Sequence, residues 1–190
     1  MGRKVYEGKV IDVSLEEVRL PNGVTTELEV IGHPGGAAVV ALNERGEVCL
    51  LRQYRHVVGG WLWELPAGKI DHREPPLATA KRELEEEAGV RAACWSSLGR
   101  MVSSPGVFCE RVYLYLAEKL TLVTPRTEVD EVIEVHWVPF AQALARAEAS
   151  SPGETEIWDA KSALAILRAG ARRGAATPAH ARGSGLRLDT

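Results

Sequence analysis

Residues 68–90 read GKIDHREPPLATAKRELEEEAGV, and this stretch decides how the chain around it folds. Pro75 and Pro76 suit a first helical turn, where a missing N–H costs little. The apolar residues that follow them recur at helical spacing and form one stripe. Gly89 suits the position just past a helix end, where a left-handed backbone is wanted. We therefore predict a loop followed by a helix that ends before Gly89.

Four carboxylates, Glu83, Glu85, Glu86 and Glu87, fall within five positions near the end of this helix. At helical spacing Glu83, Glu86 and Glu87 share one face, and like charges four residues apart repel each other. The helix macrodipole also disfavours negative charge at this end. A divalent cation would offset both effects, because hard cations prefer oxygen ligands. A solvated acidic face is the alternative, but it does not explain the fixed offsets from Gly68.

The spacing of this stretch resembles the Nudix box. Its pattern is Gly, five residues, Glu, seven residues, Arg-Glu, an aliphatic residue, any residue, Glu-Glu, any residue, Gly and an aliphatic residue, and the chain follows it from Gly68 to Val90. Over residues 5–170 the chain is similar to the ADP-ribose pyrophosphatase branch of the Nudix superfamily. The similar segments are LLRQYRHVVGGWLWELPAGKID (50–71), SSPGVFCERVYLYLAE (103–118), DEVIEVHWVP (130–139) and DAKSALAIL (159–167).

The resemblance implies a site for two or more Mg²⁺ or Mn²⁺ ions. The implied ligands are the side chains of Glu83, Glu86 and Glu87 and the backbone carbonyl of Ala67. The implied catalytic residues are Glu83, Glu86, Glu87, Arg82 and Glu131. The motif's structural positions are Gly68, Glu74 and Gly89, with Arg82 and Glu74 bracing the loop.

A loop after the box supplies a further carboxylate in this branch, as a base or an extra ligand. The segment PRTEVDEVIEV offers Glu128, Asp130 and Glu131, of which Glu131 aligns best. Arg55 matches a family arginine that contacts the substrate phosphate. Glu110 matches an acidic position after the Ser-Pro-Gly motif, and both are expected to bind substrate.

The pattern of strands and helices predicts an α+β fold, and the resemblance implies a Nudix α/β/α sandwich around a mixed sheet. Residues 1–36 are expected to form a small N-terminal β unit, with a hairpin at Asn22-Gly23. Residues 37–171 are expected to form the catalytic domain, and 172–190 a disordered tail.

Within the catalytic domain, apolar runs predict a hairpin made by residues 37–43 and 46–55 and a strand over 61–68. Residues 139–150 are expected to form a helix. Asp159 is placed to cap the last helix.

Composition limits the functions open to the chain. The net charge of −3 provides no basic field for nucleic acid, so an anionic substrate would need local arginines or metal. The three cysteines show no ligand spacing, which favours isolated thiols in a reducing compartment. No signal peptide or apolar stretch of membrane-spanning length is seen, so a cytoplasmic protein without membrane partners is expected.

The resemblance implies a hydrolase that cleaves ADP-ribose to AMP and ribose 5-phosphate. Other nucleoside diphosphate sugars, such as GDP-mannose or UDP-glucose, are alternative substrates because the box reads only the diphosphate. A non-catalytic binding module is disfavoured, since all three box carboxylates are present. The resemblance also implies a homodimer formed through the N-terminal β unit.

Overall fold

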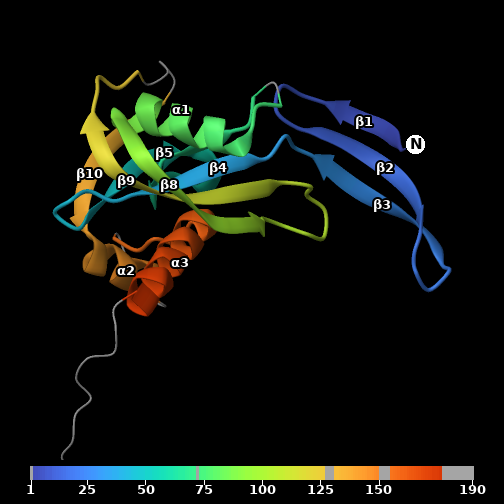
Figure 1. The fold of residues 1–190 in the computed structure, drawn as a ribbon. Helices are drawn as coiled ribbons and strands as arrows, with labels where there is room; N and C mark the ends of the chain where they lie inside the picture. Colours follow the sequence, from blue (N-terminus) through green and yellow to red (C-terminus); the bar gives the residue numbers. More distant parts are fainter. Residues whose placement is uncertain (1, 72, 127–130, 150–154, 177–190) are drawn as a thin grey trace, which may run out of the picture.

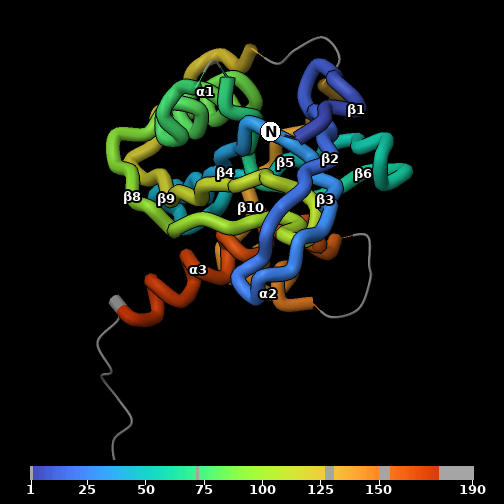
Figure 2. The backbone as a smooth tube through the Cα atoms, turned by 90° about the vertical axis from the view of Figure 1, so that its right-hand side faces the viewer, coloured from blue at the N-terminus to red at the C-terminus, as the bar shows by residue number. Residues whose placement is uncertain are grey.

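The centre of the protein is strand β4 (Gly36–Ala41), every residue of which is buried. The structure is a computed structural model that describes residues 2–71, 73–126, 131–149 and 155–176. Ala37 and Val39 pack with helix α1 (Pro76–Ala88), whereas Ala38 and Val40 pack with helix α3 (Ala160–Ala176). Helix α1 covers one face of the sheet, and α3 with α2 (Phe140–Glu148) covers the other (Figures 1 and 2). The predicted α+β class is confirmed.

Two sheets carry the strands of this body. The first sheet has the strand order β7 (Ala67–Lys69), β4, β9 (Arg111–Leu122) and β8 (Val90–Val102). It is mixed, because β4 and β9 run parallel, whereas the pairs β7–β4 and β9–β8 are antiparallel. The other is antiparallel, in the order β10 (Ile133–Pro139), β5 (Glu47–Arg55) and β6 (Gly60–Glu64). A 3₁₀ turn over His56–Val58 joins β5 to β6.

The predicted hairpin of residues 37–43 and 46–55 is wrong. Strands β4 and β5 belong to different sheets, and an isolated bridge between Leu42 and Val48 joins their ends. One edge of β4 pairs with β9 along its whole length, and the other pairs with β7 over residues 36–38, so pairing with β5 is limited to that bridge. The predicted strand over 61–68 is likewise two strands. Pro66, which has no N–H to donate, lies where the chain passes from one sheet to the other.

A separate antiparallel sheet precedes this body, made of β1 (Arg3–Glu7), β2 (Asp12–Arg19) and β3 (Thr25–Gly32). The predicted hairpin at Asn22-Gly23 is confirmed, with Gly23 at φ 84° and the Asn22 side chain accepting the N–H of Val24 at 3.1 Å. The sheet extends away from the body (Figure 1). It is attached through Ile31, whose backbone bonds to that of residues 107 and 109.

The helix ends follow the sequence closely. Helix α1 ends at Ala88, and the next residue, Gly89, has a left-handed backbone at φ 63°. Asp159 caps α3 by accepting the N–H of Ser162 at 3.1 Å. Helix α3 runs on to Ala176, so the predicted tail over 172–190 is wrong for 172–176, where alanines and arginines favour helix. Residues 177–190 lie outside the described part. None of the helices described is long and apolar enough to cross a membrane.

Candidate active site

A cavity of about 910 Å³ lies where the two helices α1 and α3 meet the ends of β5 and β7. Most of the predicted site residues line it: Arg55, Ala67, Gly68, Arg82, Glu83, Glu86, Glu87, Glu110 and Glu131. Glu74 and Gly89 lie outside its lining and act on the shape of the loop and helix. The predicted candidates Glu128 and Asp130 lie outside the described residues.

Two carboxylates of α1, Glu83 and Glu87, are buried in the wall of this cavity, with relative exposures of 8 % and 2 %. Glu87 accepts a hydrogen bond from the backbone N–H of Ala67 at 2.8 Å. The Glu83 carboxylate lies against Gly68, and a Cβ at residue 68 would overlap it. A side chain at residue 68 would therefore displace the Glu83 carboxylate from its present position, and glycine leaves that space free.

Arg82 ties the helix to the loop before it. Its Nη1 lies 2.7 Å from Glu83 Oε1 and 3.0 Å from Glu86 Oε2. Its Nη2 donates to Glu74 Oε1 at 3.0 Å and to the carbonyl of Lys69 at 3.2 Å. These contacts place the box arginine and Glu74 where a bracing role requires them.

The buried carboxylates resist ionisation. Burial is the main cause that raises the pKa of Glu83 to about 7, against the opposing effect of Arg82. Burial likewise raises the pKa of Glu87 to about 8, assisted by the charges of Glu83 and Glu131 and opposed by the bond from Ala67. The coupling to Glu131 places that carboxylate near the α1 pair. Such a cluster needs a positive partner in order to be fully ionised at neutral pH.

The donor set fits a hard divalent cation, because the buried groups that face the cavity are carboxylate oxygens. Within the described residues, no three Asp, Glu, His or Cys side chains already converge as a ligand set. Nη1 of Arg82 instead contacts both Glu83 and Glu86. Binding of an ion by these residues would replace that bridge.

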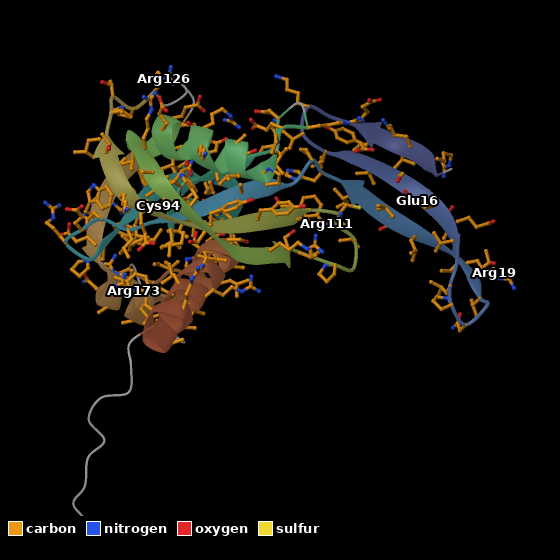
Figure 3. All side chains as sticks on the ribbon, in the orientation of Figure 1. Glu16, Arg19, Cys94, Arg111, Arg126 and Arg173 are labelled. Atoms are coloured by element: carbon orange, nitrogen blue, oxygen red, sulfur yellow. The ribbon has the colours of Figure 1, made fainter. Side chains whose placement is uncertain are left out.

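Glu85 faces a different environment from the other carboxylates of the run. It pairs with Arg91 through two contacts of 2.7 Å and with Arg126 at 3.1 Å, and it does not line the cavity. Arg126 lies beside the C-terminal end of α1 (Figure 3), where its backbone N–H donates to the carbonyl of Glu86. Glu85 is therefore a matched internal control for the carboxylates of the cavity.

A second wall of the cavity is a charged network that the sequence reasoning did not find. Arg55 makes a two-pronged pair with Glu64, at 3.0 Å from Nε and 2.8 Å from Nη2. Glu64 also accepts from Lys161 at 3.0 Å, and Lys161 donates to Asp159 at 2.9 Å. One signal was available, because Glu64 lies two residues after the buried Leu62 and so shares its inward face.

The wall nearest the N-terminal sheet contains His33 and Glu110, whose Nδ1 and Oε1 atoms lie 3.5 Å apart. The His33 Nδ1 accepts the N–H of Gly35 at 3.0 Å. Burial is the main cause that lowers the His33 pKa, so this ring is neutral at pH 7. Val10, from the connection between β1 and β2, also lines the cavity.

The fold and site together define a family. The model of the NUDIX domain matches residues 32–158, two thirds of the chain. The protein therefore belongs to the Nudix hydrolase superfamily, and the resemblance read from the box is confirmed.

Particular relatives are also similar over most of their length. The chain is 38 % identical over 165 residues to an ADP-ribose pyrophosphatase of Bacillus subtilis (strain 168), covering 86 % of each protein. It is 32 % identical over 148 residues to a GDP-mannose pyrophosphatase of Cronobacter sakazakii, covering 73 % of this chain and 74 % of that protein. The crystal structure of an ADP compounds hydrolase has the same fold, with a TM-score of 0.77, 19 % identity and 93 % of both chains covered.

The raised pKa of Glu87 predicts a pH-dependent effect of Glu87→Gln on the metal-free protein. Folded Glu87 holds its proton up to about pH 8, whereas unfolded glutamate releases it near pH 4.3. The wild type therefore loses stability from this group as pH rises between these values, and the glutamine variant does not. Melting temperatures in EDTA should shift in favour of the variant between pH 5 and pH 8.5. A difference between the two proteins that stays constant with pH would contradict the prediction.

Proposed function

We propose that this protein is a divalent-cation-dependent hydrolase that cleaves the diphosphate linkage of ADP-ribose to AMP and ribose 5-phosphate. The observation that carries the proposal is the pair of buried carboxylates, Glu83 and Glu87, in the wall of a large cavity. Two neighbouring carboxylates do not favour the binding of a neutral ligand. They do favour divalent cations, which accompany an anionic diphosphate substrate. Similarity to an ADP-ribose pyrophosphatase supports this choice of substrate.

The proposed metal ligands are the carboxylates of Glu83 and Glu87, with Glu86 assisting and the Ala67 carbonyl as a backbone ligand. Two or more Mg²⁺ or Mn²⁺ ions are proposed. When bound, such ions neutralise phosphate charge and lower the pKa of a coordinated water. The contact of Ala67 with Glu87 supports the assignment, because it holds both candidate ligands at one place.

Other residues of the chain position these groups and receive a proton. Arg82 and Glu74 hold α1 against the loop, which fixes the direction of the carboxylates. Glu131 is the proposed base, because it lines the same cavity as Glu83 and Glu87. A base must lie within reach of the attacking water, and a position in the cavity of the proposed metal ligands supports this role.

Substrate binding is assigned to the remaining walls. Arg55 is proposed to bind the diphosphate, since its guanidinium lines the cavity and is held on one side by Glu64. Glu110 is proposed to accept hydrogen bonds from a sugar hydroxyl near His33. None of these groups selects between adenine and guanine, so GDP-mannose, a substrate suggested by the Cronobacter relative, is the alternative.

A substrate panel tests the proposed function. We expect purified protein with Mg²⁺ to hydrolyse ADP-ribose with a higher kcat/KM than GDP-mannose, UDP-glucose or 8-oxo-dGTP, and to form AMP. Addition of EDTA should abolish turnover. A preference for GDP-mannose would refute ADP-ribose as the substrate but would leave the proposed hydrolysis of a diphosphate intact. The absence of turnover with every diphosphate would refute the proposed activity.

The N-terminal unit, residues 1–36, is proposed to form a homodimer interface and to complete the substrate pocket. All of strand β1 is exposed, and Val5, Tyr6 and Leu28 expose 48 %, 56 % and 41 % of their surface. Glu16 and Arg19 lie on the part of this sheet that extends from the body (Figure 3). An exposed sheet with an open edge and apolar side chains favours pairing with another chain.

Light scattering tests the dimer. The expected mass at micromolar concentration is twice the 20.7 kDa of one chain. Removal of the N-terminal sheet is not a suitable control, because it would also remove Val10 from the cavity. Tyr6→Lys adds charge to the exposed face of this sheet and should therefore weaken the dimer. A wild type that is monomeric at this concentration would refute the assignment.

A cytoplasmic location is also proposed, consistent with three cysteines that are all free.

A further inference from the structure

The charged network opposite the α1 carboxylates has a feature that the proposed function does not use. Glu64, only 2 % exposed, is contacted by two cations, Arg55 and Lys161. Lys161 comes from the first turn of α3 and lies 97 residues from Glu64 in the sequence. The side chain of Lys161 is 20 % exposed, whereas that of Arg55 is 36 % exposed. Arg55 is therefore the more accessible cation. Both side chains line the cavity, and Lys161 contacts the Glu64 carboxylate that holds Arg55.

Lys161 is held in place by the start of its helix. Its ammonium bridges Glu64 and Asp159, and Asp159 is fixed in turn by the N–H of Ser162. The Ser162 hydroxyl accepts the backbone N–H of Leu65 at 2.8 Å, which docks α3 against the end of β6. Although burial alone would lower it, the charges of Asp159 and Glu64 raise the pKa of Lys161, so the side chain stays charged.

The electrostatic consequence concerns Arg55. A carboxylate that pairs with a single guanidinium cancels most of its field, so such an arginine attracts phosphate weakly. Here Glu64 is shared between Arg55 and Lys161, and Lys161 also pairs with Asp159, so the network has two positive and two negative charges. Without Lys161 the two carboxylates would leave a net negative charge beside Arg55. The two-pronged contact occupies Nε and Nη2 of Arg55, and the rest of the guanidinium stays available for a ligand.

We infer that Lys161 is a positioning residue for diphosphate binding, acting through Glu64 on the direction and effective charge of Arg55. This inference rests on the proposed role of Arg55 in the proposed function. It assigns a task to the first turn of α3, whose residues Ala160 and Lys161 line the cavity.

The test is a double-mutant cycle on ADP binding, measured by calorimetry at a fixed Mg²⁺ concentration. We expect Lys161→Met to weaken ADP about tenfold, the size of a partly screened charge effect, and Lys161→Arg to restore most of the affinity. In an Arg55→Met background, Lys161→Met should have little further effect, because the residue through which it acts is absent. With the diphosphate substrate that the wild type hydrolyses fastest, KM should rise with less change in kcat.

Ser162→Ala is the structural control. It removes the contact that docks α3 on β6 and the bond that the Ser162 hydroxyl donates to Asp159, but Asp159 keeps its bonds from the Ser162 N–H and from Lys161. It should therefore lower the melting temperature while leaving ADP affinity near the wild-type value. Unchanged ADP affinity in Lys161→Met would overturn the inference alone. A tenfold loss that persists without Arg55 would also overturn it, because Lys161 would then contact the ligand itself. Failure of the wild type to bind ADP would overturn the inference, because Arg55 would then not bind a diphosphate at this site, whereas the proposed hydrolysis is refuted separately by the absence of turnover in the substrate panel.

Discussion

The burial of two glutamates on one helix is the constraint on which the rest of the site depends. Glu83 and Glu87 lie one turn apart and are nearly covered. Burial is the main cause that raises the pKa of both, and the charge of Glu83 raises that of Glu87 further. Such an arrangement costs folding free energy unless positive charge compensates it. The structure supplies part of that compensation through Arg82 and the N–H of Ala67, and the remaining imbalance is what a divalent cation would remove.

The fold makes this arrangement possible by fixing three elements around one central strand. Strand β4 is buried on both faces, so α1 and α3 are held on opposite sides of the same sheet. Strand β7 pairs with β4 and brings Ala67 and Gly68 beneath the carboxylates. The start of α3 reaches the other wall, where it meets the ends of β5 and β6. The carboxylates of α1 and the charged pairs of Arg55 and Lys161 thus line one cavity.

Structural features that depend on neighbouring residues were predictable from the sequence. The limits of α1, the Asp159 cap and the carboxylate spacing follow from residues within one or two helical turns of each other. The pairing of β4 was not predictable in this way. A short connection to residues 46–55 suggested a hairpin, but the partner of β4 is β9, whose paired residues lie some 76 positions later, as in Gly36 with Val112. The Glu64–Lys161 contact was missed for the same reason, because its two ends meet only when the tertiary structure forms.

The central claim is that Glu83 and Glu87 form a cation site and that the neighbouring Glu85 does not. Calorimetric titration of Mn²⁺ into the wild type, Glu83→Gln and Glu85→Gln at pH 8 tests it most directly. The account predicts saturable binding in the wild type, little change in Glu85→Gln, whose side chain pairs with Arg91 outside the cavity, and loss of binding in Glu83→Gln. Equal Mn²⁺ binding by all three proteins, or none by the wild type, would contradict it.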